Sequence, residues 1–231
     1  MWNKNKIIIW IDEAGRGPWL GPVSAVALCF NPKNMPDKSF IKSLWDSKKL
    51  SEKKRDELYW ELIEMSRWSK PQIFFWLGLV DNFIIDEINI RQANREAMRR
   101  AIIELSRKIE SHHLDSLKGI EIELEVLIDW RDNYDFEELK VKPTYIVWGD
   151  WKIAEIWAAS IIAKVFRDKI LIQYATLYPD LWIENHKWYW TKKHSENLKN
   201  KKDITWIHRL SYKPVKKVLE NKKNNEKSTK K

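Results

Sequence analysis

The sequence predicts an α/β domain in which helices flank a mixed sheet, followed by a helical C-terminal extension. Short apolar runs, typical of buried strands, are interleaved with longer segments whose apolar residues recur every three or four positions. The order along the chain is strands, helix, strand, helix, two strands and then helices, which is typical of a mixed sheet. A chain of 231 residues is long enough for one sizeable domain with a small appendage.

Five segments are predicted to be strands. Residues 6–12, KIIIWID, form a buried first strand, and residues 23–30, VSAVALCF, are its hairpin partner across the turn-rich connection EAGRGPWLGP. The other three predicted strands are residues 72–80, 122–129 and 144–148.

Helical periodicity predicts the layers around the sheet. Ser51 is placed to cap a helix that runs to about Trp68. A long helix is expected from about Asp86 to Glu110, and another over residues 153–178. In the first of these long helices, small and aliphatic residues that permit close packing recur at every fourth position: Ala93, Ala97, Ala101, Leu105 and Ile109.

The C-terminal part is predicted to be helical and then disordered. Shorter helices are expected at 191–201 and 213–221, whereas residues 221–231 contain too few apolar residues to pack. We therefore divide the chain into a main domain at residues 1–180, a helical extension at 181–220 that packs on it, and a basic, disordered tail at 221–231.

The net charge favours an anionic partner. Lys and Arg number 42 against 33 Asp and Glu, which gives a formal charge of +9 and a pI near 9.4. The last eleven residues contain five lysines and one glutamate, so more than half of the net charge belongs to the body. This balance is typical of nucleic-acid-binding proteins, with a merely soluble basic surface as the alternative.

Nothing in the sequence indicates a membrane or a secreted protein. No run approaches the roughly 18 consecutive apolar residues of a membrane span. The N-terminal segment reaches acidic residues after an apolar run of only five residues, 7–11, so we do not expect a signal peptide. Cys29 is the single cysteine and cannot form an internal disulfide. We expect a reduced, cytoplasmic protein.

Four acidic residues stand where predicted strands end or turns begin: Asp12, Glu13, Asp129 and Asp150. A carboxylate that ends a buried strand is costly unless it is paired, hydrogen-bonded or bound to a metal ion. A cluster at one sheet edge would suit Mg²⁺ or Mn²⁺, which prefer oxygen ligands. Because adjacent strand residues point to opposite faces, this requires the first strand to end at Asp12. Capping or surface carboxylates are the alternative.

Two turn segments are candidates for phosphate contacts. Gly15 and Gly17 flank Arg16, and exposed amides beside a guanidinium suit a phosphate or a sugar. The DSKKL segment, residues 46–50, places two lysines just before a helix N-terminus, which also suits phosphate. A solvated helix start is the simpler explanation of this second segment.

Tryptophan is unusually common and glycine unusually rare, with 15 and 6 residues. If about ten of the tryptophans were replaced by glycine, the glycine content would reach its usual value of about 7% of residues. In HKWYWTKKH, residues 186–194, two tryptophans surround Tyr189 among cations, a pattern that suits stacking on nucleic acid. They also stand in a turn before a helix that begins at Thr191, where glycine is usual.

Together these motifs resemble the ribonuclease HII family, the type 2 ribonucleases H, from about Lys6 to Val218. The segments that carry the resemblance are IDEAGRGPWLGPV, DSKKLSEKKR, INIRQANREAMRRAI, LID at 127–129, GDWKIAEIWAASIIAKVFRD, HKWYWTKKH and IHRLSYKPV. The resemblance implies an RNase H-like fold with a five-stranded mixed sheet, and makes residues 1–180 the catalytic domain.

The resemblance also implies roles for particular residues. The catalytic carboxylates, which would bind two divalent ions, Mn²⁺ or Mg²⁺, are Asp12, Glu13, Asp129 and Asp150. Gly15, Arg16 and Gly17 would grip the sugar–phosphate at the ribonucleotide, and Tyr189 would stack at the junction beside it. Ser47 and Lys48 would lie near the substrate backbone.

The implied activity is that of a monomeric endonuclease of DNA replication and repair. It would hydrolyse the RNA strand of RNA/DNA hybrids and cut at ribonucleotides embedded in duplex DNA, leaving 3′-hydroxyl and 5′-phosphate ends. One alternative is a non-catalytic hybrid-binding protein, that is, an inactivated copy. Such a protein would not need all four acidic residues, and this chain has all four. Another two-metal nuclease, such as a resolvase, is a second alternative, but it would not need the Gly-Arg-Gly segment and the tyrosine.

The departures from the family pattern all replace glycine by tryptophan. They are Trp10, Trp130, Trp151, Trp182, Trp188, Trp190 and Trp206, whereas Trp19 is compatible with the family. Selection would not favour this replacement, because tryptophan is the largest residue and does not readily adopt a positive φ. Reading UGA as tryptophan, in a source that reads it as glycine, would produce this pattern. We therefore expect glycine at these seven positions.

Overall fold

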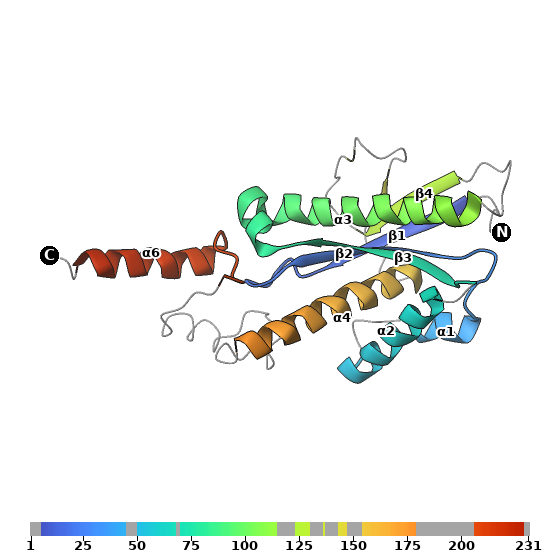
Figure 1. The fold of residues 1–231 in the computed structure, drawn as a ribbon, viewed down its shortest axis with the longest axis horizontal. Coiled ribbons are helices and arrows are strands. Elements are labelled where there is room, and N and C mark those ends of the chain that lie inside the picture. The colour runs from blue at the N-terminus through green and yellow to red at the C-terminus, as the bar shows by residue number, and fades with distance from the viewer. Residues whose placement is uncertain are drawn as a thin grey trace.

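The computed structural model describes residues 6–44, 50–67, 70–114, 123–129, 136, 143–146, 154–178 and 206–228. Its centre is a five-stranded sheet with the order β3-β2-β1-β4-β5 (Figure 1). The strands are β1 (Lys6–Ala14), β2 (Val23–Phe30), β3 (Ile73–Val80), β4 (Glu123–Asp129) and β5 (Thr144–Ile146). The helices of the described part are α1 (Lys38–Ser43), α2 (Glu52–Arg67), α3 (Asn82–Leu114), α4 (Ala154–Leu177) and α6 (Lys213–Ser228).

The sheet is mixed, as the sequence predicts. β1 pairs antiparallel with β2, and β2 pairs antiparallel with β3. On its other side β1 pairs parallel with β4, which pairs parallel with β5. Because β1 and β4 are parallel neighbours, their C-terminal ends lie at the same edge of the sheet.

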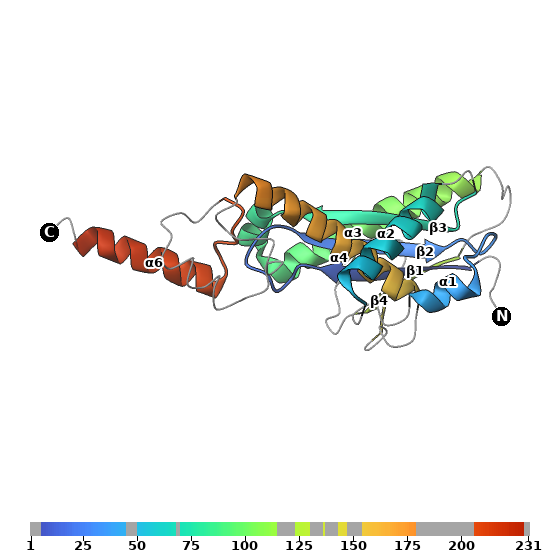
Figure 2. The ribbon, with the colours of Figure 1, turned by 90° about the horizontal axis from the view of Figure 1, so that it is seen from below.

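Helices cover both faces of the sheet (Figures 1 and 2). α3 lies along one face, and α4 lies along the other together with α2 and α1. The side chains of β1 alternate between them: Ile9 and Ile11 belong to the core on the α3 face, whereas Trp10 packs with Leu127 and Ile156 on the α4 face. None of the described helices is long and apolar enough to cross a membrane.

Helix α3 confirms the predicted buried stripe but begins earlier than predicted. The stripe residues are at most 1% exposed: Ala93, Ala97, Ala101, Leu105 and Ile109. The helix begins at Asn82 and is interrupted at Asn89, whose φ is 68°. Its ψ is 161°, so the residue lies outside the left-handed helical region, in a conformation that non-glycine residues rarely adopt. The Asn89 side-chain oxygen accepts hydrogen bonds from the backbone N–H groups of Arg91 and Gln92 at 3.0 and 3.2 Å, as an N-cap does.

Gly78 allows α3 to approach β3 more closely than a side chain would permit. A Cβ atom built at Gly78 would lie 1.9 Å from the backbone oxygen of Ala97. We expect Gly78→Ala to push the helix from the sheet and to lower the free energy of unfolding by roughly 1–3 kcal/mol. Denaturant unfolding measures this, with Gly17→Ala as the control, because a Cβ at Gly17 meets nothing within 4 Å. Equal stability of the two variants would contradict the expectation.

Side-chain caps define the two helices that follow the first hairpin. The Asp37 side-chain oxygen accepts hydrogen bonds from the N–H groups of Ser39 and Phe40, both at 2.9 Å, and begins α1. The sequence analysis did not predict α1, because a helix of six residues is too short to show a clear periodicity. α2 begins after Ser51 as predicted, and the Ser51 hydroxyl accepts a hydrogen bond from Lys54 N–H at 3.2 Å.

The C-terminal helix α6 is longer than predicted. The sequence predicts a helix over 213–221 and disorder beyond it, but α6 continues to Ser228, so the prediction of disorder is wrong over residues 221–228. Near the start of α6, the buried Val215 packs against Trp19. Beyond this contact the helix projects from the body of the molecule (Figure 1). The helix predicted at 191–201 and the predicted domain boundary near residue 180 lie outside the described residues.

The segment that precedes α6 is tied to the start of α3. The Asn82 side-chain amide donates to the carbonyl oxygens of Trp206 at 2.7 Å and His208 at 3.3 Å. The Asp86 carboxylate accepts hydrogen bonds from the N–H groups of Leu210 at 2.7 Å and Ser211 at 2.8 Å. These bonds dock this segment on the main domain.

Candidate active site

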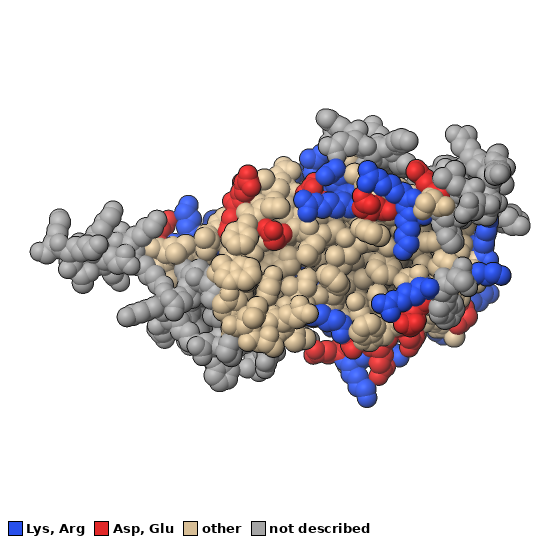
Figure 3. Space-filling model, in the orientation of Figure 1, with Lys and Arg blue, Asp and Glu red and all other residues tan. Residues whose placement is uncertain are grey.

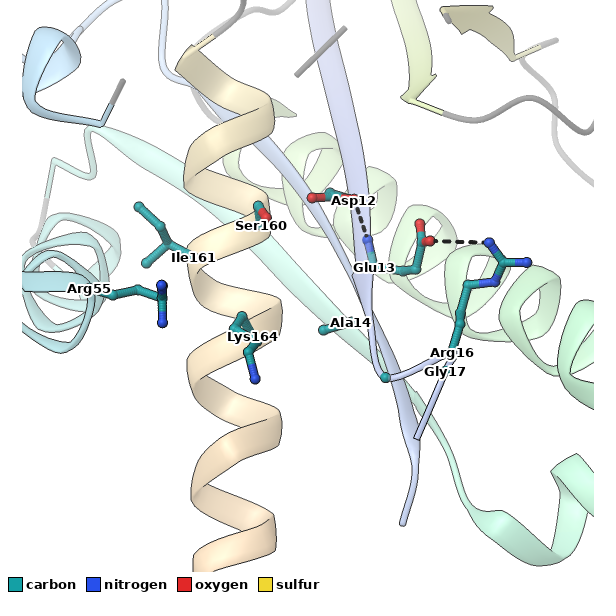
Figure 4. Close-up of a pocket in the computed structure, with 10 residues that line it drawn as sticks. Asp12, Glu13, Ala14, Arg16, Gly17, Arg55, Ser160, Ile161 and Lys164 are labelled. Carbon is teal, nitrogen blue, oxygen red and sulfur yellow. Dashed lines mark hydrogen bonds and ion pairs between the residues drawn. The ribbon is translucent and has the colours of Figure 1, made fainter. Parts of the chain in front are cut away.

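Asp12 and Glu13 lie near the C-terminal end of β1. The prediction that the strand ends at Asp12 is wrong, because β1 continues to Ala14 and Glu13 pairs with Ala25 of β2. The two side chains therefore leave the strand on opposite sides, Asp12 toward α4 and Glu13 toward Arg16 (Figure 4). Both nevertheless line one cavity.

The cavity has a volume of about 520 Å³ and lies among β1, the loop that follows it, and helices α2 and α4. The carboxylates of β1 lie on one side of it, and Arg55 of α2 and Lys164 of α4 lie on the other (Figure 4). The lining residues are Asp12, Glu13, Ala14, Gly15, Arg16, Gly17, Arg55, Ser160, Ile161 and Lys164. Acidic and basic groups thus share one solvent-accessible space.

Local polar contacts orient the charged groups of the cavity. The backbone N–H of Glu13 donates to Oδ1 of Asp12 at 2.8 Å. The Arg16 guanidinium lies 3.7 Å from Oε1 of Glu13. Across the cavity the Arg55 guanidinium donates to the carbonyl oxygen of Leu50 at 2.9 Å. A phosphodiester that approached the carboxylates would therefore meet cations on both sides of them.

Three cavity residues with polar or charged side chains are absent from the predicted site: Arg55, Ser160 and Lys164. Ser160 and Lys164 are four residues apart in α4, so they lie on one helix face, and this spacing was the available signal. The charge of Lys164 is partly balanced by an ion pair with Asp168. Arg55 could not be placed from the sequence, because only the packing of α2 against α4 brings it to the cavity.

The strand register places residue 129 beside residue 12. Ile11 pairs with Ile128 in the parallel ladder between β1 and β4, so Asp12 and Asp129 are the next residues on the two strands. The backbone thus brings two of the four predicted carboxylate positions to one sheet edge, as the sequence analysis expected. The side chain of Asp129 is outside the described part, as are Asp150, Ser47, Lys48 and Tyr189.

Gly15 is a position that requires glycine. Its φ is +96°, and a Cβ atom there would lie 2.1 Å from Nε of Arg167. Gly17 is exposed and has space for a Cβ atom, so backbone strain does not explain its identity. Both residues line the cavity together with Arg16, and their role at the substrate stays a prediction.

The donor set fits a hard divalent cation. Carboxylate oxygens are the ligands that Mg²⁺ and Mn²⁺ prefer, and Asp12 and Glu13 present them to a cavity large enough for an ion with bound water. Among the side chains that the structure describes, no three His, Cys, Asp or Glu residues form a cluster. The register places the Asp129 backbone beside Asp12, which is where the predicted third carboxylate would join these two.

Comparison with known proteins agrees with this geometry. Residues 9–215 match the family described as Ribonuclease HII. The chain belongs to the ribonuclease HII family. The ribonuclease HII of Endomicrobium trichonymphae is 42% identical over 215 residues, which are 93% of this chain and 89% of that protein. The ribonuclease HII of Ligilactobacillus salivarius (strain UCC118) is 38% identical over 220 residues, which are 95% of this chain and 74% of that protein.

Solved structures share the fold at lower sequence identity. The ribonuclease H2 from Pyrococcus horikoshii OT3 superimposes with a TM-score of 0.63 at 23% identity, covering 93% of this chain and 98% of that one. Bst-RNase HIII in complex with Mn²⁺ superimposes with a TM-score of 0.67 at 15% identity, covering 95% and 71%. These likenesses confirm the predicted RNase H-like fold. Membership of the ribonuclease HII family makes the chain an enzyme, a metal-dependent endonuclease, and supports ribonuclease H activity on RNA/DNA hybrids.

Proposed function

We propose that this ribonuclease HII cuts the RNA strand of hybrids and also cuts at single ribonucleotides embedded in duplex DNA, leaving 3′-hydroxyl and 5′-phosphate ends. The observation that carries the proposal is one cavity that joins the Asp12 and Glu13 carboxylates to the loop Gly15–Arg16–Gly17. The first group suits phosphodiester hydrolysis, and the second suits recognition of the sugar–phosphate beside the scissile bond.

The carboxylates would hold the divalent ions on which the chemistry depends. Asp12 and Glu13, with Asp129 and Asp150, would bind two Mg²⁺ or Mn²⁺ ions. When bound, such ions activate a water molecule and neutralise charge on the leaving 3′-oxygen. Because Asp12 and Glu13 point to opposite sides of β1, they would approach the reacting phosphate from different directions.

The cations around the carboxylates would bind the substrate backbone. Arg16, Arg55 and Lys164 line the cavity, where they would contact the scissile phosphate or its neighbours. Elsewhere, Figure 3 shows Lys and Arg side chains along the α3 side of the molecule, interspersed with Asp and Glu. The net charge of +9 would add general attraction to a duplex. The protein would act on these duplexes as a monomer in the cytoplasm.

Selectivity would depend on the 2′-hydroxyl, the group that distinguishes RNA from DNA at a single position. Gly15, Arg16 and Gly17 would contact this sugar, and Tyr189 would stack on the junction next to it. Gly17 is exposed and has no side chain, so a sugar can approach its backbone closely.

The test compares duplexes that differ at one sugar. A DNA duplex with one central ribonucleotide, the same duplex with deoxyribose there, and a full RNA/DNA hybrid are incubated with Mg²⁺ or Mn²⁺, and the products are sized and end-labelled. We expect cutting of the hybrid and of the ribonucleotide duplex, and none of the all-DNA duplex. Equal cutting of all three would overturn the proposal, and cutting of the hybrid alone would overturn its embedded-ribonucleotide part.

A further inference from the structure

A buried arginine near the C-terminus holds the loop that carries Gly15, Arg16 and Gly17. Arg209 is 0% exposed. Its guanidinium donates to four carbonyl oxygens of this loop, those of Gly15 at 2.7 Å, Pro18 at 2.8 Å, Gly21 at 2.9 Å and Arg16 at 3.2 Å. The rigid fork of arginine donors suits such simultaneous contacts, and a lysine could not reproduce them.

Tyr212 completes the arrangement around the Arg16 carbonyl group. Its hydroxyl accepts a hydrogen bond from Arg209 at 2.8 Å and donates one to the carbonyl oxygen of Arg16 at 2.6 Å. The backbone reinforces the contact, because Arg209 N–H donates to the carbonyl oxygen of Trp19 at 2.7 Å and Gly21 N–H donates to that of Ile207 at 2.9 Å. Residues far apart in the sequence therefore form one hydrogen-bonded unit.

A second buried arginine holds the far side of the same loop. Arg167 of α4 is 1% exposed and donates to the carbonyl oxygens of Pro22 and Leu20, both at 3.0 Å. It also fills the space next to Gly15 that a Cβ atom would need. Two cations from distant segments thus hold the loop conformation, which the loop's own glycines at positions 15 and 21 make possible through their positive φ.

These contacts determine the direction of the loop amides. In a trans peptide unit the C=O and N–H groups point in opposite directions, and the described residues contain no cis peptide bond. The carbonyl oxygens of Gly15 and Arg16 point to Arg209, so the N–H groups of Arg16 and Gly17 point away from it. Gly17 is exposed and both residues line the cavity, so these amides face the side from which substrate approaches.

We propose that Arg209 and Tyr212 are positioning residues that aim the amides of Arg16 and Gly17 at the sugar–phosphate of the substrate. This inference rests on the proposed function, because it takes the ribonucleotide as the group that these amides contact. Donors held rigidly before substrate binds need no reorganisation during the reaction. Neither residue touches the substrate, and each acts through the peptide groups that it holds.

Kinetic measurements on two variants and a control test the proposal. Tyr212→Phe removes one hydroxyl and is expected to lower kcat/KM on the single-ribonucleotide duplex roughly fivefold, the effect of losing its hydrogen bond to the Arg16 carbonyl oxygen. Arg209→Lys loses several carbonyl contacts together and is expected to lower it on the order of a hundredfold. Tyr59→Phe is the control, because Tyr59 is also buried but belongs to α2 and lies outside the cavity lining.

Two further readouts separate positioning from general loss of structure. Affinity for the all-DNA duplex should stay unchanged in Tyr212→Phe, and the melting temperature should fall by only a few degrees, the effect of two lost hydrogen bonds in a protein that stays folded. With ¹⁵N-glycine labelling, the Gly17 amide resonance should shift in Tyr212→Phe but not in Tyr59→Phe, because Gly17 N–H belongs to the peptide unit whose oxygen the Tyr212 hydroxyl binds.

The outcomes distinguish the two proposals. An unshifted Gly17 resonance, or unchanged kcat/KM in both Tyr212→Phe and Arg209→Lys, would overturn the positioning role. A parent protein that cuts none of the ribonucleotide substrates would overturn the proposed function. In that case a shifted Gly17 resonance in Tyr212→Phe would still support the assignment of the loop geometry to Tyr212.

Discussion

Asp12→Asn is expected to abolish metal-dependent cleavage while leaving the fold and duplex binding intact. The substitution removes a charge from the cavity and almost no volume. The asparagine oxygen can still accept the hydrogen bond that Glu13 N–H donates at 2.8 Å, so the local backbone should not move. A neutral amide is a much weaker ligand for a hard divalent cation, and we expect cleavage to fall by roughly a thousandfold or more.

The matched control is Asp37→Asn. Asp37 is an exposed N-cap of α1, and asparagine caps a helix about as well as aspartate. Cleavage of the hybrid under single-turnover conditions, thermal melting and duplex affinity are measured for both variants. Magnesium-dependent cleavage retained by purified Asp12→Asn would refute the role of Asp12, and an equal loss in Asp37→Asn would show that the effect is not specific to the cavity.

A chain with glycine at all seven anomalous tryptophan positions should be better folded and more active than the sequence as written. Two of the seven, Trp10 and Trp206, lie in the described part of the chain. The indole nitrogen of Trp10 is buried and has no hydrogen-bond partner among the residues that the structure describes, and an unpartnered buried donor costs about 1–3 kcal/mol. Trp206 is 52% exposed and stacks on Phe83, which is 59% exposed. Trp206 also makes edge-to-face contacts with Tyr174 and Tyr178, so the structural argument for glycine rests on Trp10 and not on Trp206.

Neither Trp10 nor Trp206 is strained by a positive φ. Among the described non-glycine residues only Asn89 has a positive φ, so Trp10 and Trp206 adopt backbone conformations open to any residue. Strain at positive φ therefore remains a prediction for the five positions outside the described residues, above all for the turn around Tyr189. There each unfavourable backbone conformation would cost on the order of 1–3 kcal/mol.

Reading the codons and comparing the proteins tests this prediction. UGA codons at the seven positions would confirm it, and the glycine form should then melt at a higher temperature and cut the hybrid faster. Trp19→Gly is the control, and this substitution should lower stability instead of raising it, because Trp19 is 8% exposed and packs against Val215. Losing its indole should cost about 3–5 kcal/mol. UGG codons, or full activity with all seven tryptophans present, would contradict the prediction.

Much of the fold and part of the site follow from local sequence patterns. The stripe from Ala93 to Ile109 marks the buried face of α3, because a helix repeats its faces every three to four residues whatever it packs on. The acidic residues at strand ends marked the sheet edge where Asp12 and the Asp129 backbone meet. The helix stripe depends only on neighbours in the chain, so the sequence by itself determined it, whereas the meeting of residues 12 and 129 also needs the pairing of β1 with β4.

The tertiary structure decided how distant segments meet. Arg209 resembles any surface cation in the sequence, yet it is 0% exposed and binds four carbonyl groups of a loop near the N-terminus. Arg55 and Lys164 reach the cavity only because α2 and α4 pack together on one face of the sheet. The physical reason is that local propensities specify helices and strands but not their neighbours in space. A charge can be buried only where oxygen atoms from remote segments surround it, and no pattern of neighbouring residues encodes that arrangement.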